Sequence, residues 1–287
     1  MGLYGNTKGV KRVGGENSRD HAFSATARSL PLLENDTAAL TLAFYYSFAR
    51  HPHIRMLLIM PLCLGLFFLF MYRAGAYGGQ LAGETAWIPM AALAWPFFNF
   101  SLFLFNVFGV DAQSFQGLML LPVQRRKYLI AKNIALAPFV LGLSLFFVAT
   151  GALLVQAPLR VIALSLILAA HLYLFFSVVG NYLSVGFPYR INRDALRQPT
   201  RRLRMVIVGV ASTALATLMI LPATCCMLAE RFLSVHPDIM VRNAGILSAA
   251  ALLVSSLAAY MVGLSVFGDQ FTEREHRIYL RISGDRE

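Results

Sequence analysis

Charged residues are scarce in this sequence. Lys, Arg, Asp and Glu make up 14% of the 287 residues, whereas hydrophobic residues make up 57%. A soluble globular protein carries about 25% charged residues. The missing charges leave long apolar stretches, and a chain of this length cannot bury several helices that are apolar on every face inside one water-soluble core. The composition therefore favours a membrane protein, because a helix needs about 20 mostly apolar residues to span a bilayer.

Residues that build catalytic or metal centres are also few. The three cysteines, Cys63, Cys225 and Cys226, have no histidines at metal-ligand spacing, and an adjacent pair is strained as a disulfide. We interpret them as small packing residues. The sequence has no HExxH, no GxSxG, no paired carboxylates and no glycine-rich phosphate loop with a lysine. We therefore expect no catalytic residue, no metal and no directly bound cofactor, and no ATP hydrolysis by this chain alone.

Six runs that carry almost no charge predict six membrane-spanning helices. We place these spans at about residues 54–72, 86–109, 130–156, 160–187, 204–229 and 243–267. The third and fourth spans are separated only by a corner around Pro158, Leu159 and Arg160, so they form a helical hairpin. The expected fold class is all-α: a polytopic membrane protein with about six transmembrane helices.

Lysine and arginine are distributed unevenly among the loops. They are concentrated before the first span and after the second, fourth and sixth, whereas the other loops hold only Arg73, Arg160, Arg231 and Arg242. Basic loops mark the cytoplasmic side, so we expect both termini in the cytoplasm and a multi-pass protein of the cell inner (plasma) membrane. The net charge of +11 lies in these loops rather than along one face, so we expect the lipid bilayer, and no nucleic acid, as a partner.

The chain divides at about residue 31. Residues 1–31 are polar and are expected to form a flexible segment, and residues 32–287 form the transmembrane domain. Within residues 32–50, Asn35, Asp36 and Thr37 favour a helix start ahead of an apolar stretch. This pattern predicts an interfacial helix on the cytoplasmic leaflet, and a plain apolar linker is the alternative.

His171 is the titratable side chain that lies well inside a predicted span. Ionisable groups at that depth are costly and often functional, so His171 is a candidate intramembrane polar site that relays protons or contacts a substrate. A neutral histidine that hydrogen-bonds to a neighbouring helix is the other interpretation. The lack of intramembrane carboxylates and of a convincing repeat argues against an ion-coupled secondary transporter.

The loop between the second and third spans has the most informative pattern. It predicts a short amphipathic helix over about residues 111–121, followed by a basic cytoplasmic anchor where the chain enters the membrane. Such a helix can press its apolar side into a groove of a soluble partner. The residues that make the pattern are, in order, Phe108-Gly109, Asp111, Phe115, Leu118, Leu120, Pro122, Arg125, Arg126 and Lys127.

In this order of residues the loop resembles that of ABC-2-class permeases, the membrane-spanning subunits of one group of ATP-binding-cassette transporters. Residues 180–185 (GNYLSV), with Phe187-Pro188 after them, are similar to a second segment of those permeases, and Glu273-Arg274-Glu275 to a third. The resemblance covers about residues 35–285 and includes the six-span plan. Some of these permeases are about twice this length, so the resemblance is compatible with a complete permease, with a half-length form and with part of a longer permease.

The resemblance implies that residues 111–121 are a coupling helix that docks on a separate nucleotide-binding ATPase subunit. Asp111 would cap this helix, while Phe115, Leu118 and Leu120 would fill a groove of the ATPase. A second permease half, in a homodimer or heterodimer, and alternating access driven by ATP that the partner uses are also implied, in an exporter. A non-transporting membrane scaffold or assembly subunit is the alternative, and an integral membrane enzyme centred on His171 or His236 is a further one.

Overall fold

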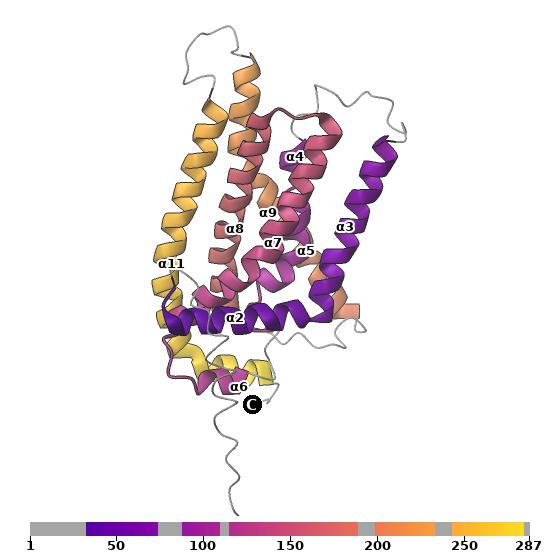
Figure 1. Cartoon of the computed structure of the whole chain (residues 1–287). Coiled ribbons are helices and arrows are strands. Elements are labelled where there is room, and N and C mark those ends of the chain that lie inside the picture. The colour runs from indigo at the N-terminus through magenta and orange to yellow at the C-terminus, as the bar shows by residue number, and fades with distance from the viewer. Residues whose placement is uncertain (1–32, 74–87, 110–114, 189–198, 233–242, 284–287) are drawn as a thin grey trace, which may run out of the picture.

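The computed structural model describes residues 33–73, 88–109, 115–188, 199–232 and 243–283, and these residues are helical apart from short turns. No strand occurs in these five ranges. With the labels of Figure 1, the helices in chain order are α2 (Asn35–Arg50), α3 (Pro52–Arg73), α4 (Ile88–Ala91), α5 (Ala94–Leu104), α6 (Phe115–Met119), α7 (Arg125–Val155), α8 (Leu159–Gly186), α9 (Pro199–Phe232) and α11 (Ala244–Ser283).

Four helical segments are long and apolar enough to cross a membrane: Pro52–Tyr72, Arg125–Val155, Leu159–Gly186 and Ala244–Arg281. This confirms the prediction of an all-α fold and indicates a multi-pass membrane protein. Two further apolar helical stretches, Ile88–Leu104 and Ala214–Cys226, are shorter. They fall within the second and fifth predicted spans, so the number six stays a prediction.

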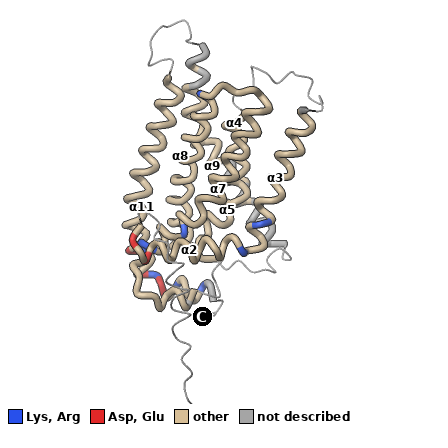
Figure 2. Tube along the Cα trace, viewed as in Figure 1, with Lys and Arg blue, Asp and Glu red and all other residues tan. Residues whose placement is uncertain are grey.

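The long helices run side by side, and α2 lies across one end of their bundle (Figure 1). There α2 packs on α7 and contacts α3, while α6 lies just beyond this end. Most charged residues that the structure describes lie at the same end, which we call the charged end, and the helix shafts above it carry almost none (Figure 2). The distribution of charge therefore distinguishes the two ends of the bundle.

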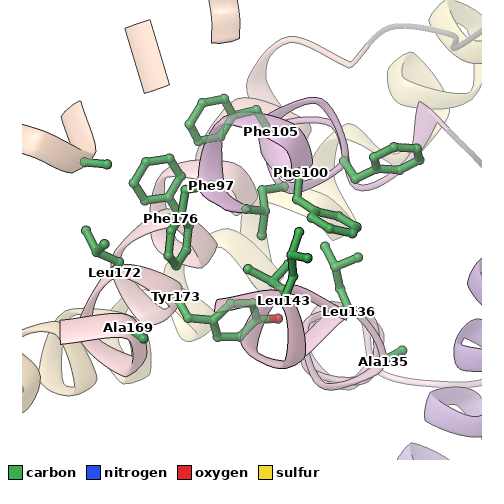
Figure 3. Close-up of a cluster of buried hydrophobic side chains, with 14 of the residues drawn as sticks. Phe97, Phe100, Phe105, Ala135, Leu136, Leu143, Ala169, Leu172, Tyr173 and Phe176 are labelled. Atoms are coloured by element: carbon green, nitrogen blue, oxygen red, sulfur yellow. The ribbon is translucent and has the colours of Figure 1, made fainter. Parts of the chain in front are cut away.

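The core lies where α5 meets α8. Phe97 of α5 and Phe105 just after it both contact the ring of Phe176, with ring centroids 5.1 and 5.4 Å apart, and all three side chains are buried. Figure 3 shows these rings in one cluster with Leu172 of α8 and Leu143 of α7. Burial of this apolar surface fixes the end of α5 against the middle of the bundle.

The helix α5 ends at Leu104, before the predicted end of the second span at about residue 109. At Gly180 of α8 a Cβ atom would lie 1.9 Å from the carbonyl oxygen of Leu104, so only glycine permits this approach. Beyond the helix end, the N–H of Val107 donates to Oγ of Ser184 at 2.9 Å. Irregular backbone at membrane depth must find its partners within the protein, and these small residues of α8 provide the space and one of the partners.

A tight turn joins α7 and α8 at the expected corner. Gln156 adopts a left-handed conformation with φ of 51°, and the N–H of Ala157 donates to the carbonyl of Ala152 at 3.0 Å. Pro158 then precedes the first turn of α8. The turn satisfies a carbonyl at the end of α7, and the two helices form an antiparallel hairpin (Figure 1).

Two predicted helix boundaries differ from the structure. The N-cap residue of α2 is Glu34, and its side chain makes no capping hydrogen bond. Asn35, Asp36 and Thr37 therefore lie inside the first turn, and Thr37 is buried. The last helix also continues without a break to Ser283, well past the predicted end of the sixth span at about residue 267. Glu273-Arg274-Glu275, the third segment that carries the resemblance, therefore lies within α11.

The cysteines do not pack as predicted. Cys63 of α3 and Cys225 of α9 are exposed, Cys226 is half-buried, and all three are free thiols. Because the outer faces of α3 and α9 are apolar, a thiol there behaves as one more small apolar side chain facing lipid. Burial in the bundle is therefore not the reason for cysteine at the two exposed positions.

Candidate functional site

The helix α6 lies at the charged end, within the region where the sequence predicts a coupling helix (Figure 1). The described helix covers Phe115–Met119 rather than the predicted residues 111–121. Asp111, the predicted cap, lies outside the described residues. The other predicted residues of this helix can be placed, and the structure separates them into buried and exposed ones.

Phe115 holds α6 to the rest of the protein. Its side chain is fully buried, and its ring lies 5.5 Å from Phe108 and 6.4 Å from Phe271 between centroids. Phe108 and Phe271 are themselves 4.7 Å apart. A ring enclosed in such a cluster stabilises its own chain and is not presented to a partner, so the groove-filling role expected of Phe115 does not fit this structure.

Two exposed leucines follow the last turn of α6. Leu120 is 82% exposed and Leu121 is 40% exposed, whereas Leu118 is half-buried against the core. We call Leu120 and Leu121 the leucine pair. Leu120 was predicted as a contact residue, and Leu121 was missed because a five-residue helix is too short for its apolar spacing to define a face.

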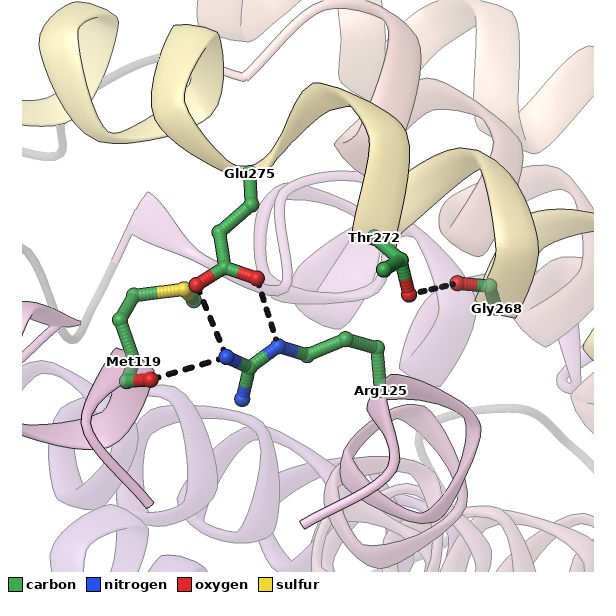
Figure 4. A network of polar contacts seen from close by, with 5 residues as sticks. All are labelled: Met119, Arg125, Gly268, Thr272 and Glu275. Atoms are coloured by element: carbon green, nitrogen blue, oxygen red, sulfur yellow. Dashed lines mark hydrogen bonds and ion pairs between the residues drawn. The ribbon is translucent and has the colours of Figure 1, made fainter. Parts of the chain in front are cut away.

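Arg125, the first residue of α7, ties α6 to the end of α11 (Figure 4). Its Nε and Nη2 atoms donate to the two carboxylate oxygens of Glu275 at 2.9 and 2.8 Å, and Nη2 also donates to the carbonyl of Met119 at 2.8 Å. The two charged side chains are 12% and 28% exposed. A bidentate pair of this kind is strong and directional, so Arg125 has a structural role besides the predicted role as a basic anchor.

The two other residues of the predicted anchor behave differently from each other. Lys127 pairs with Glu34 and lies 3.9 Å from Asp36, which links α7 to the start of α2. Arg126 is exposed and borders a cavity of about 610 Å³ between residues 121–126 and α11. Two basic residues, Arg125 and Arg126, and two acidic residues, Asp269 and Glu275, line this cavity, and Leu121 of the leucine pair borders it.

Lys132 of α7 is a buried cation that was not among the predicted site residues. It is 1% exposed and donates to the carbonyl of Val107 in the irregular segment after α5. Its Nζ atom also lies 5.1 to 5.6 Å from the ring centroids of Phe44, Phe108 and Tyr128. Ring faces attract a cation, and together these contacts join α2, the end of α5 and α7.

A second polar group lies between α7, α8 and α11. Nδ2 of Asn133 donates to the hydroxyl of Tyr260 at 3.1 Å and lies 3.4 Å from Oδ1 of Asn181. The hydroxyl of Tyr173 donates to the carbonyl of Asn133. Asn181 belongs to the second segment that carries the permease resemblance, so that segment contributes to helix packing here.

His171 makes its contacts with α11. Its Nδ1 atom lies 3.0 Å from the carbonyl oxygen of Leu252 and 2.8 Å from Oγ of Ser256, and the side chain is 2% exposed. These are the contacts of a histidine that joins two helices. Within the described part of the chain, no group of three or more His, Cys, Asp or Glu side chains is placed to hold a metal ion.

An open apolar cavity of about 1110 Å³ lies among α3, α4, α5, α7 and α9, and we call it the apolar groove. Among the described residues of its lining, Thr217 is the one with a polar side chain of the Ser/Thr type, and the others are apolar or aromatic. None of the described lining residues comes from α8 or α11, the two helices that His171 joins. Its lining includes Leu64, Phe68, Trp95, Phe98, Ala214 and Leu218.

The site that the structure assembles therefore differs from the predicted one. Phe115 and Leu118 turn inward, Leu120 stays at the surface, and the partners of Arg125 and Lys132 come from distant parts of the chain. Gly109, directly after Phe108, is the sequence signal that could have indicated the irregular segment in which the carbonyl of Val107 accepts from Lys132. Comparisons with models of protein families, with curated proteins and with solved structures found no match for this chain.

Proposed function

We propose that this chain is the membrane-spanning permease subunit of an ATP-driven ABC transporter, working as an exporter with six spans and both termini in the cytoplasm. A separate nucleotide-binding ATPase subunit supplies the energy, and a second permease half, identical or different, completes the transporter. The resemblance of the loop after α5 and of residues 180–185 to ABC-2-class permeases supports this proposal. Part of the first segment forms α6, and Gly180 of the second lies where α8 contacts the end of α5.

The single observation that carries the proposal is the leucine pair at the charged end. The excess of basic residues supports the proposed orientation, in which this end faces the cytoplasm and no lipid covers an exposed leucine. Leu120 is 82% exposed there, beside a cavity that residues of both charge signs line. An apolar pair with a polar rim suits a protein groove better than it suits water. The ATPase subunit is the partner whose docking on this surface the proposal requires.

The apolar groove supports a transport path next to α9. Its walls come from separate helices, and small movements of α9 or α3 against α5 would widen or close it. In the proposed cycle, ATP binding by the partner moves the leucine pair, and the bundle alternates between states that open the path to one side or the other. A bistable arrangement of this kind needs no ionisable residue in the path.

The proposal is tested by co-purification of the tagged chain in mild detergent. We expect a soluble ATPase to accompany the wild-type chain, and the variant Leu120→Asp/Leu121→Asp to lose it while eluting as a folded monodisperse protein. Leu159→Asp is the matched control, because Leu159 is 80% exposed but lies at the opposite end of the bundle, at the start of α8.

Two results would count against the proposal. If no ATPase accompanies the folded wild-type chain, the scaffold interpretation replaces the transporter. If the ATPase binds the wild type and both variants equally, the leucine pair is not the docking surface. Phe115 is unsuitable for this test, since an acidic residue in its buried cluster would disturb the fold itself.

A further inference from the structure

The short helix α6 is attached to α11 by two separate contacts. The first is apolar, because the buried ring of Phe115 lies against Phe271 of α11. The second is polar, because Arg125 holds the carbonyl of Met119 and the carboxylate of Glu275 together. Phe271 and Glu275 are four residues apart, so they share one face of α11. The surface that carries the leucine pair therefore rests on one face of one helix.

The covalent link from α6 to α7 is weaker in mechanical terms. Residues 121–124 between them are not helical. Within this stretch, the N–H of Val123 donates to the carbonyl of Leu121 at 2.8 Å. An extended linker bends easily, whereas a bidentate ion pair and a ring cluster transmit displacement in a fixed direction. Movement of α6 therefore reaches α11 through the contact of Phe115 with Phe271 and, by way of Arg125 at the start of α7, through Glu275.

The helix α11 is one element of 40 residues; its shaft runs along the bundle, and its last part turns across the charged end near α6 (Figure 1). At a rise of 1.5 Å per residue it is about 60 Å long. It packs along α8 and also contacts α9, which forms one wall of the apolar groove. A displacement at Glu275 therefore has a continuous helical path to the groove wall.

We propose that Arg125 and Glu275 are positioning residues that make α11 the lever between the docking surface and the apolar groove. This inference rests on the proposed function and adds the route by which the ATPase acts on the path. Loss of the pair leaves the leucine pair able to bind the ATPase, since Phe115 still anchors α6. It uncouples that binding from movement of α9.

The test measures groove accessibility in the complex of the tagged chain with its co-purified ATPase, in lipid nanodiscs. The three native cysteines, Cys63, Cys225 and Cys226, are replaced by serine, and Ala214→Cys introduces one thiol in the groove wall. The rate at which a maleimide labels this thiol is measured with and without ATP. We expect ATP to change this rate in the parent. Glu275→Gln should reduce the change by about threefold or more, as for residues along a coupling route, and Glu275→Arg should abolish it.

Charge reversal provides the rescue. Arg125→Glu/Glu275→Arg restores the ion pair in the opposite sense but not the hydrogen bond to the Met119 carbonyl, so we expect it to recover part of the ATP-dependent change. The matched control is Glu273→Arg, which makes the same charge change at an exposed position of the same helix and should behave as the parent. A purely structural role for the pair would alter thermal stability without this pattern of loss and recovery.

The outcomes separate this inference from the proposed function. If no ATPase co-purifies with the parent, the proposed function fails. If it co-purifies and the Glu275 variants keep an ATP-dependent change as large as that of the parent, α11 is not the lever. A reversed pair that stays as insensitive to ATP as Glu275→Arg would likewise overturn the inference. Should Glu275→Arg fail to fold, Glu275→Gln and the reversed pair decide the question.

Discussion

The contact between Gly180 and the end of α5 makes a stringent test of the fold. In Gly180→Ala the new Cβ atom would lie 1.9 Å from the carbonyl oxygen of Leu104 and 2.9 Å from its carbonyl carbon. Both partners are backbone, so no side chain can turn away. The contact must lengthen to about 3.4 Å before it is ordinary, and the hydrogen bond from Val107 to Ser184, one turn along α8, would be stretched with it.

The magnitude follows from these terms. Overpacking in a filled interior costs about 1–3 kcal/mol, and a weakened hydrogen bond adds about 0.5–1.5 kcal/mol. Alanine in a helix gains back about 1 kcal/mol relative to glycine. We therefore expect Gly180→Ala to lose roughly 1–3 kcal/mol, which at about 2–4 °C per kcal/mol lowers the melting temperature by roughly 2–12 °C.

The assay is the fraction of monodisperse protein that survives heating in mild detergent, followed by size-exclusion chromatography. The matched control is Gly142→Ala in α7, where a Cβ atom would meet nothing within 4 Å, and which should keep or slightly raise the melting temperature. If Gly180→Ala has the same melting temperature as Gly142→Ala, α5 does not end against α8 as described. The account of the irregular segment after it would then be wrong.

Two further predictions concern the charged end. Lys132→Met keeps an unbranched side chain of similar length among the rings but leaves the buried carbonyl of Val107 without this donor, so we expect a loss of about 1–3 kcal/mol in the same heating assay. Lys127→Met, at an ion pair on the outside of α7, should cost much less stability. Equal losses would contradict the burial of Lys132. A green fluorescent protein fused after Glu287 should fluoresce in intact bacterial cells, whereas one inserted after Gln156, in the turn at the opposite end, should not; the reverse pattern would refute the proposed orientation.

The sequence predicts the long apolar helices well because the bilayer imposes a simple condition on composition. The spans expected at about residues 130–156 and 160–187 match the apolar parts of Arg125–Val155 and Leu159–Gly186 within a few residues. The corner between them carries its own signal in Pro158. No information from other parts of the chain was needed for either prediction.

The candidate site was harder to predict because it depends on contacts between distant residues. Lys132 looks like a membrane-entry residue in the sequence, and its burial depends on Phe44 of α2 and on the carbonyl of Val107. The inward direction of Phe115 depends in the same way on Phe271 of α11. Side-chain directions in a five-residue helix follow from such contacts and not from its own periodicity.

The order of synthesis gives the contacts of α11 another meaning. Ribosomes deliver the α7–α8 hairpin to the membrane well before α11, which is the last helix of the described chain. Until then Asn133 lacks Tyr260 and His171 lacks Ser256, so two polar groups of the hairpin stay without their final partners in a lipid environment. Completion of α11 removes both defects at once. A chain truncated before this helix would therefore present the cell's quality-control proteases with a hairpin whose polar groups are still exposed.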